Sequence, residues 1–236
     1  NTHYSYDRAT KFLISLDTKS IVIHADAGAT EIVLPEGIAS LGGFYKGNEN
    51  ITKVTFPKSL TIIDENAFKG CSALTEIVFP VYADGETATL TEIGASAFDT
   101  TGLVNVTIPA YVQIIGDKAF QYTASLNEFV VEKDSELTVI PQYLLAYSGV
   151  KNVYFNGKTE KGVSKITEVR AYAFSNSKSL NLVDCYYLCA CEDGFYLLVI
   201  DRKYKKTEII KEIQQIFKKH IEKYEEQVEK RGKVTC

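Results

Sequence analysis

Short runs of alternating apolar and polar residues recur along most of the chain. The clearest are "TKVTFP" (52–57), "TEIVFP" (75–80), "VNVTIP" (104–109), "NEFVVE" (127–132) and "KNVYFN" (151–156). Alternation of this kind predicts a strand with one buried face, so Ile77 points inward while Glu76 and Val78 point outward. Proline follows several runs and ends the strand, because it lacks the N–H that would extend the ladder.

A second phrase precedes each strand, with an apolar residue, three variable residues and then Ala-Phe or a close equivalent. Its copies are "IDENAF" (63–68), "IGASAF" (93–98), "IGDKAF" (115–120), "IPQYLL" (140–145) and "VRAYAF" (169–174). The last residues of successive copies are 22 to 30 positions apart, a period typical of a solenoid. We expect each phrase to form a short strand or turn and then one helical turn. In the third copy Ile115 and Phe120 lie inside, and Ala119 allows a close backbone approach.

The repeats predict a β-rich α/β solenoid with a parallel sheet over residues 30–185. One unit cannot bury both its strand row and its Phe, whereas stacked copies bury both as continuous ladders. The longer units differ by polar insertions at 81–89 and 156–165, which are expected to be surface loops. Residues 1–29 contain further alternating runs and are predicted to form a β-rich cap over the first layer.

The C-terminal segment, residues 186–236, breaks the period and is predicted to be a cap or connector. Within it, about 207–231 carry an apolar stripe at helical spacing, with Thr207 as a possible N-cap and Gly232 as the stop. We expect this amphipathic helix to lie against the last repeat. Self-association, or a stalk to a further region, are the alternatives.

The phrase "IDENAFKGCSALTEIVFP" (63–80) resembles the BspA-like leucine-rich repeats of bacterial and protist surface proteins, including the cysteine at Cys71. The resemblance implies a right-handed leucine-rich repeat coil, here of about six repeats. It also implies an extracellular or cell-surface protein, secreted or surface-bound, that acts in adhesion or host–microbe interaction without catalysis. The expected partner is therefore a protein, such as an extracellular-matrix or host cell-surface ligand. A structural spacer that presents another domain is the alternative.

Charge and hydropathy limit the classes of partner that the chain can be expected to bind. The net charge is −4, yet residues 201–233 carry eleven basic and seven acidic residues, so the remainder of the chain is distinctly acidic. An acidic solenoid disfavours nucleic acid as a partner. No apolar run reaches about 18 residues, so membrane attachment is expected only through an anchor outside this chain.

The sequence offers little support for catalysis or a cofactor. Three scattered histidines have no partner pattern, and neither a nucleophile elbow nor a phosphate-binding loop occurs. A possible disulfide set lies toward the C-terminus: Cys185, Cys189, Cys191 and Cys236. A zinc site there is the less favoured alternative, because the spacings do not form paired C-x-x-C units. We therefore expect that the protein is not an enzyme and that it binds no metal and no cofactor. A metal- or cysteine-dependent protein is the least favoured alternative function.

Binding is expected on the exposed face of the sheet, where outward strand positions align across layers. The predicted partner-binding face consists of two adjacent columns: Glu76, Asn105, Glu128 and Asn152 in one, and Val78, Thr107, Val130 and Tyr154 in the other. The second column supplies apolar and aromatic anchors, although β-branched residues also suit any strand face. Asn50 and Asn105 begin N-x-S/T sequons, which we interpret as chance occurrences.

Overall fold

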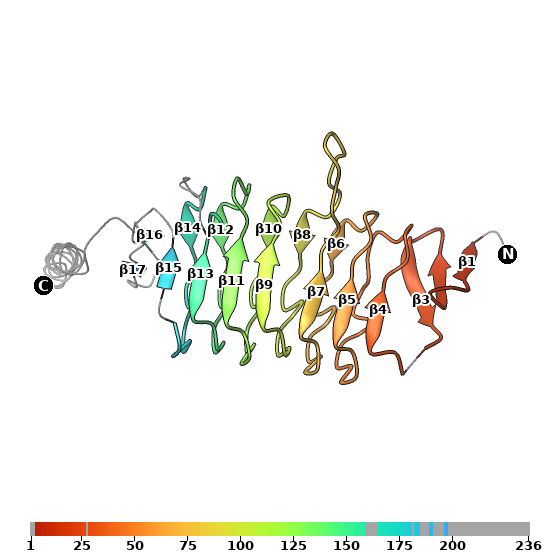
Figure 1. The fold of residues 1–236 in the computed structure, drawn as a ribbon, viewed down its shortest axis with the longest axis horizontal. Coiled ribbons are helices and arrows are strands. Elements are labelled where there is room, and N and C mark those ends of the chain that lie inside the picture. The colour runs from red at the N-terminus through yellow and green to blue at the C-terminus, as the bar shows by residue number, and fades with distance from the viewer. Residues whose placement is uncertain are drawn as a thin grey trace, which may run out of the picture.

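The computed structural model describes residues 3–26, 28–158 and 165–180, together with the backbone of 182–184, 189–190 and 196–197. These residues form a parallel β-solenoid of about five turns. Its layers follow one another along the long axis of the molecule (Figure 1). All regular structure in the described residues is β-strand, and none of it is helix.

Two rows of parallel strands run along the solenoid. The longer strands form one row: β4 (Glu31–Val33), β5 (Lys53–Thr55), β7 (Glu76–Val78), β9 (Asn105–Ile108), β11 (Glu128–Val131), β13 (Asn152–Tyr154) and β15 (Leu182–Asp184). The two-residue strands form the other row: β6 (Ile62–Ile63), β8 (Glu92–Ile93), β10 (Ile114–Ile115), β12 (Val139–Ile140) and β14 (Glu168–Val169). Each repeat therefore contributes one long and one short strand, as the two phrases predict.

The helical turn expected after each short strand is wrong. The chain makes tight turns there, because two positions in each repeat have a positive φ, which cannot continue a right-handed helix. The first left-handed column lies two residues before the phrase's last residue: Asn66, Ser96, Lys118, Tyr143 and Tyr172. The second left-handed column lies two residues after it: Gly70, Thr100, Tyr122, Tyr147 and Asn176. In the described residues the solenoid is therefore all-β rather than α/β.

An aromatic ladder runs through the core at the last position of each phrase. The rings of Tyr45 and Phe68 are 5.5 Å apart and those of Phe68 and Phe98 are 5.6 Å apart, both pairs being stacked. Phe98 and Phe120 continue the stack at 5.2 Å, and buried Leu145 takes the next place. The inward positions predicted for Ile115 and Phe120 are confirmed by their burial.

The close backbone approach predicted at Ala119 is present, since its carbonyl oxygen accepts a hydrogen bond from the Phe98 amide of the preceding layer at 2.8 Å, and Gly116 makes a second close approach. A Cβ built on Gly116 would lie 2.4 Å from the backbone nitrogen of Ala95 in the preceding layer, a distance that side chains essentially never adopt. Ala119 is fully buried, as a small residue at a contact between layers should be. The glycine of "IGDKAF" thus allows the two layers to stack this closely.

A buried polar position accompanies the ladder. The Cys71 thiol donates to the carbonyl oxygen of Tyr45 at 3.1 Å. In later repeats the Thr123 hydroxyl donates to Phe120 at 2.7 Å and the Ser177 hydroxyl to Leu145 at 2.6 Å. Burial raises the pKa of the Cys71 thiol to about 11. Cys71 is therefore a buried structural residue, as its place in the repeat predicts.

The N-terminal residues form an antiparallel sheet of β1 (Tyr4–Asp7), β2 (Phe12–Ser15) and β3 (Ser20–His24). The sheet contacts the first layer, because the His24 ring lies 4.1 Å from Phe12 and 6.2 Å from Tyr45. The strands expected in residues 1–29 are present, and their role as a cap stays a prediction.

At the other end, the backbones of β16 (Cys189–Ala190) and β17 (Tyr196–Leu197) pair antiparallel. The helix predicted at about 207–231 lies outside the described residues. The domain limits 30–185 and 186–236 stay predictions.

Candidate functional site

The outward strand positions align across layers as the sequence predicts, but in two separate sheets. Asn105, Glu128 and Asn152 are register partners, and so are Thr107, Val130 and Tyr154. On the N-terminal side, Glu76 and Val78 are in register with Lys53 and Thr55. No ladder joins the two sets, because β7 ends the sheet β4-β5-β7 and β9 ends the sheet β15-β13-β11-β9. The predicted continuous face is broken between Val78 and Thr107.

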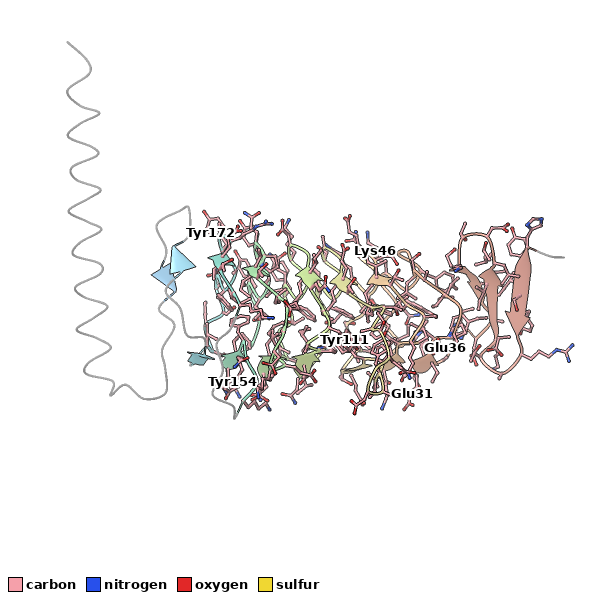
Figure 2. All side chains as sticks on the ribbon, turned by 90° about the horizontal axis from the view of Figure 1, so that it is seen from above. Glu31, Glu36, Lys46, Tyr111, Tyr154 and Tyr172 are labelled. Atoms are coloured by element: carbon pink, nitrogen blue, oxygen red, sulfur yellow. The ribbon has the colours of Figure 1, made fainter. Side chains whose placement is uncertain are left out.

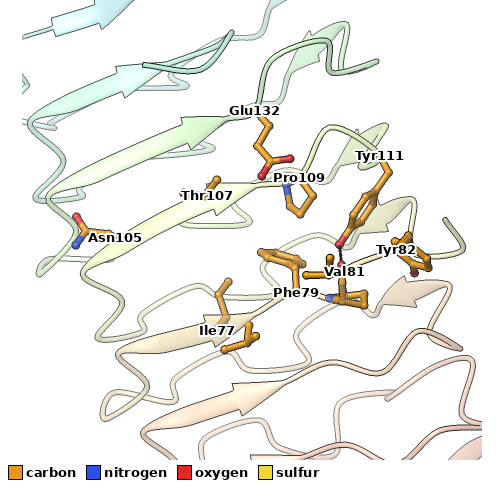
Figure 3. A pocket seen from close by; sticks show the side chains of 11 residues that line it. Ile77, Phe79, Val81, Tyr82, Asn105, Thr107, Pro109, Tyr111 and Glu132 are labelled. Atoms are coloured by element: carbon orange, nitrogen blue, oxygen red, sulfur yellow. Dashed lines mark hydrogen bonds between the residues drawn. The ribbon is translucent and has the colours of Figure 1, made fainter. Parts of the chain in front are cut away.

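A cavity of about 530 Å³ opens at this break (Figure 3). Three predicted face residues line it: Val78, Asn105 and Thr107. Further lining residues include Phe79, Tyr82, Tyr111 and Glu132. This sheet-break cleft is concave and mixes aromatic with polar groups, as small binding sites do.

Both ends of the break are held together by contacts between the layers. At the carboxyl end of the strands, the Tyr111 hydroxyl donates to the carbonyl oxygen of Pro80 at 2.8 Å (Figure 3), and burial raises the pKa of Tyr111. At the amino end, a Cβ on Gly102 would lie 2.4 Å from the carbonyl oxygen of Ser72. The cleft is therefore a bounded slot, and the two sheets belong to one stack.

The insertion at 81–89 forms one wall of the cleft and is fixed to the preceding layer. The Tyr82 hydroxyl donates to the carbonyl oxygen of Lys58 at 3.3 Å, and the Thr89 hydroxyl donates to that of Leu60 at 2.9 Å. The Lys58 ammonium also pairs with Glu86 at 2.6 Å. The Tyr82 ring then meets the edge of Tyr111 at 5.1 Å, so two aromatic rings stand between the layers.

Exposure along the predicted face differs from the expectation at one anchor. Asn105, Thr107 and Glu76 are exposed, and Val78, Glu128, Asn152 and Tyr154 are half-buried. Val130, by contrast, is only 5% exposed. It lies between Thr107 and the large Tyr154 in the register, and Lys158 reaches back to pair with Glu128 on the same strand. Because it is buried, Val130 is not available as a contact residue.

The face predicted from the sequence did not include the residues that close the cleft. Phe79, Tyr82 and Tyr111 come from three different segments around the break, and Glu132 accepts a hydrogen bond from the Ala110 amide at 3.1 Å. Their positions in the sequence could have indicated them, because Tyr82 lies near the start of the 81–89 insertion and Tyr111 lies two residues after Pro109.

The remaining predicted features add no chemistry to this site. The described residues contain no group of three or more His, Cys, Asp or Glu side chains arranged to hold a metal. No helix in the same part of the chain is long and apolar enough to span a membrane. The side chains of Cys185, Cys189, Cys191 and Cys236 lie outside the described residues, so the disulfide stays a prediction. Both sequon asparagines, Asn50 and Asn105, are exposed.

The repeats of this chain match a known family of repeat proteins. The sequence model of the BspA type leucine-rich repeat region matches residues 4–127 and 40–181, in six copies. The chain belongs to this family. No curated protein matches the sequence significantly.

Solved structures confirm the leucine-rich repeat fold at low sequence identity. The pneumococcal vaccine antigen PcpA is 16% identical with a TM-score of 0.58, covering 82% of this chain and 53% of that one. A leucine-rich cell surface protein from Faecalibacterium prausnitzii is 19% identical with a TM-score of 0.51, covering 84% and 61%. The BspA-type chain thus spans little more than half of these structures.

Proposed function

We propose that this BspA-type chain is a non-catalytic protein-interaction module that binds its partner through the exposed sheet face, with the sheet-break cleft at the centre of contact. The observation that supports this most is the cleft itself, which hollows the face at Val78, Asn105 and Thr107. The module acts in an extracellular or cell-surface setting, in the manner of an adhesin. One structural relative is named a cell surface protein, which supports this placement.

The cleft suits an apolar side chain of a protein partner. Its aromatic walls, Phe79, Tyr82 and Tyr111, offer apolar surface, while the facing edges of β7 and β9 offer strand-edge N–H and C=O groups. A partner's polypeptide carries both complementary features, an apolar anchor and backbone hydrogen-bonding groups.

The lining residues favour binding over catalysis at this site. Glu132 is the only carboxylate among them, the lining contains no His, Cys, Ser or Lys, and both tyrosyl hydroxyls donate to backbone carbonyl oxygens. General acid–base or nucleophilic chemistry needs a group that can exchange a proton with the substrate or an activated nucleophile. Binding is therefore the activity that this lining supports.

The test replaces Val78 and Thr107 together by arginine, which fills the cleft and leaves the core positions unchanged. Immobilised native and variant chains are compared for capture of extracellular-matrix and host cell-surface proteins, and each captured protein is then titrated in pure form. We expect the double variant to weaken the affinity by about tenfold or more, the loss typical of a hot spot.

Val33→Arg is the matched control, because Val33 occupies the same outward column at β4 and is 60% exposed. The control should bind like the native chain. Equal binding by the Val78→Arg/Thr107→Arg variant would refute the cleft as the contact centre. That outcome would favour the spacer function, in which the solenoid only holds another domain at a distance.

A further inference from the structure

The edge of β7 that faces the sheet-break cleft carries unpaired backbone groups. The Phe56 amide donates to the carbonyl oxygen of Val78 at 2.9 Å, so the backbone groups of Val78 point toward β5. Successive residues of a strand direct their N–H and C=O groups to opposite edges, so those of Ile77 and Phe79 point into the cleft. Among the described residues, no backbone hydrogen bond or ladder joins this edge to β9.

The edge of β9 on the other side of the cleft is in the same condition. The Glu132 amide donates to the carbonyl oxygen of Ile108 at 2.9 Å, so the backbone groups of Ile108 and of Val106 point toward β11. Those of Asn105 and Thr107 therefore face the cleft. A single extended chain between the two edges would provide partners for both.

Inward side chains of β7 are also exposed at this break. Ile77 and Phe79 are half-buried and line the cleft (Figure 3). The equivalent residues of β5, Val54 and Phe56, are 0% and 3% exposed, because β5 has a paired strand on each side. The break therefore leaves open both the hydrogen-bonding edge and the apolar contact that a neighbouring strand provides in the preceding layer.

The outer edge of β4 differs from the cleft in this second respect. Among the described residues β4 pairs only with β5, so its other edge is unpaired too. Its inward residues Ile32 and Leu34 are nevertheless only 2% and 3% exposed. An added strand would gain little apolar contact there. The 81–89 insertion does not fill the cleft either, because its hydrogen bonds fix it to the preceding layer.

From these edges we infer that the partner contributes a short extended segment, which lies between β7 and β9 and completes the sheet across the break. The inference rests on the proposed function, since it specifies how a protein partner occupies the same cleft. The volume of about 530 Å³ is in the usual range of binding sites. Strand addition supplies affinity through main-chain hydrogen bonds and specificity through alternate side chains.

The two ends of the cleft limit the length of the segment. The layers touch at Gly102 at one end and are bridged by Tyr111 at the other, so about three residues, or about 10 Å of extended chain, fit between them. Figure 2 shows Glu31 and Tyr154 on one edge of the solenoid and Tyr172 on the opposite one, with Tyr111 toward the edge of Glu31 and Tyr154. The segment therefore approaches from the side formed by the long strands.

The register determines the side-chain pattern of this segment. A residue beside Ile77 points inward with it, and so does the residue two positions further, beside Phe79. Both should be apolar, because they pack on these exposed core residues. The residue between them points outward, beside Val78 and Thr107, and meets solvent. We therefore expect the pattern apolar–any–apolar.

The chain itself provides a probe of this pattern. Residues 52–56 (TKVTF) contain the strand that pairs with the opposite edge of β7, and Val54 and Phe56 are its inward apolar residues. A synthetic peptide of this sequence, acetylated and amidated, is titrated into the isotope-labelled full chain. Binding is followed residue by residue by two-dimensional NMR and by amide hydrogen exchange.

We expect the peptide to shift the amide signals of Ile77, Phe79 and Thr107 and to slow their hydrogen exchange, because it supplies the missing acceptors. The matched control is the same peptide N-methylated at Val54 and Phe56, which blocks one of its two edges and retains its side chains. Because this peptide cannot pair with both walls, it should bind about tenfold more weakly.

Variants of the chain locate the peptide. Val78→Arg/Thr107→Arg should weaken its binding by about tenfold, and Val33→Arg on β4 should leave it unchanged. The inference is overturned if the peptide does not affect the cleft amides, or if the N-methylated peptide binds equally well. It is also overturned if Val33→Arg weakens binding in place of the cleft variant, which would locate the peptide at β4. Dimerisation that the peptide displaces would overturn it in favour of a second copy.

The same experiment separates this inference from the proposed function. If Val78→Arg/Thr107→Arg loses capture of the partner while the peptide does not bind in the cleft, the contact centre stands and only the added strand is overturned. If the peptide binds in the cleft while capture by the double variant is unchanged, the strand site stands and the proposed function fails.

Discussion

The aromatic ladder should contribute more to stability than any comparable part of the core, and Phe98 is the position that tests this. Its side chain is fully buried and stacks on Phe68 at 5.6 Å and on Phe120 at 5.2 Å. Phe56 also meets it edge-on at 6.5 Å. Truncating a buried Phe to Ala costs about 3–5 kcal/mol, and stacked pairs are worth about 0.5–1.5 kcal/mol each beyond burial. We therefore expect Phe98→Ala to lower the free energy of unfolding by about 4–5 kcal/mol.

Phe98→Leu is the matched variant, because the chain itself places Leu145 at this ladder position. Leucine retains most of the buried apolar volume, so we expect it to cost only about 1.5 kcal/mol. Equilibrium urea unfolding measures both variants, followed by far-ultraviolet circular dichroism and by tyrosine fluorescence, since the chain has no Trp. With a slope of about 2 kcal/mol/M, Phe98→Ala should shift the midpoint by about 2 M.

The result that would refute the reasoning is a Phe98→Ala cost near that of Phe98→Leu. It would mean that the layers relax into the space left by the ring and that the stack adds little. A second outcome is informative, because repeat folds are held by contacts between neighbouring layers. If Phe98→Ala makes the two spectroscopic transitions separate, the ladder also couples the two halves of the solenoid.

Two further predictions concern the layer contacts and the N-terminal sheet. Gly116→Ala should destabilise the chain by about 3 kcal/mol, because its Cβ would lie 2.4 Å from the Ala95 nitrogen, whereas Gly43→Ala, which meets nothing within 4 Å, should be near neutral in the same urea assay. Burial between Phe12 and Tyr45 lowers the pKa of His24, so the unfolded chain binds this proton more readily. Stability is then complete above the unfolded pKa of about 6.5 and declines as the pH falls below it. His24→Phe retains the ring contacts and should reduce the loss in melting temperature on acidification; an unchanged pH dependence would contradict this assignment.

The strand register could be predicted from the sequence because a solenoid pairs equal positions of successive repeats. Glu128 therefore lies beside Asn152, and Thr107 beside Val130, as the aligned phrases indicate. The exposure of Val130 could not be predicted in this way. It depends on side chains of neighbouring strands, such as Thr107 and Tyr154, which are the register partners of Val130.

The break in the sheet was also hidden from the sequence. The runs at β7 and β9 alternate as regularly as the others, so local pattern alone predicts pairing between them. The break results from contacts between distant segments, in which Tyr82 and Tyr111 stand between the layers while Gly102 lets the layers touch at the other end. The cleft that centres the proposed function is thus a property of how two unequal repeats stack.

The left-handed tyrosines could not be predicted from the local sequence either, because the repeat imposes this conformation on residues as different as Ser96, Thr100 and Lys118. A non-glycine residue in the left-handed region costs about 1–2 kcal/mol, so the four tyrosines together cost at least about 4 kcal/mol. Their two stacked pairs return about 0.5–1.5 kcal/mol each, and less where solvent reaches the rings. Gly70 and Asn176 show that the same turn forms with residues that suit it. The conformation is maintained because the amides of these columns donate hydrogen bonds to the next layer, as from Tyr122 to the carbonyl oxygen of Ala146 at 3.0 Å. Stacking between layers therefore offsets the local cost at these positions.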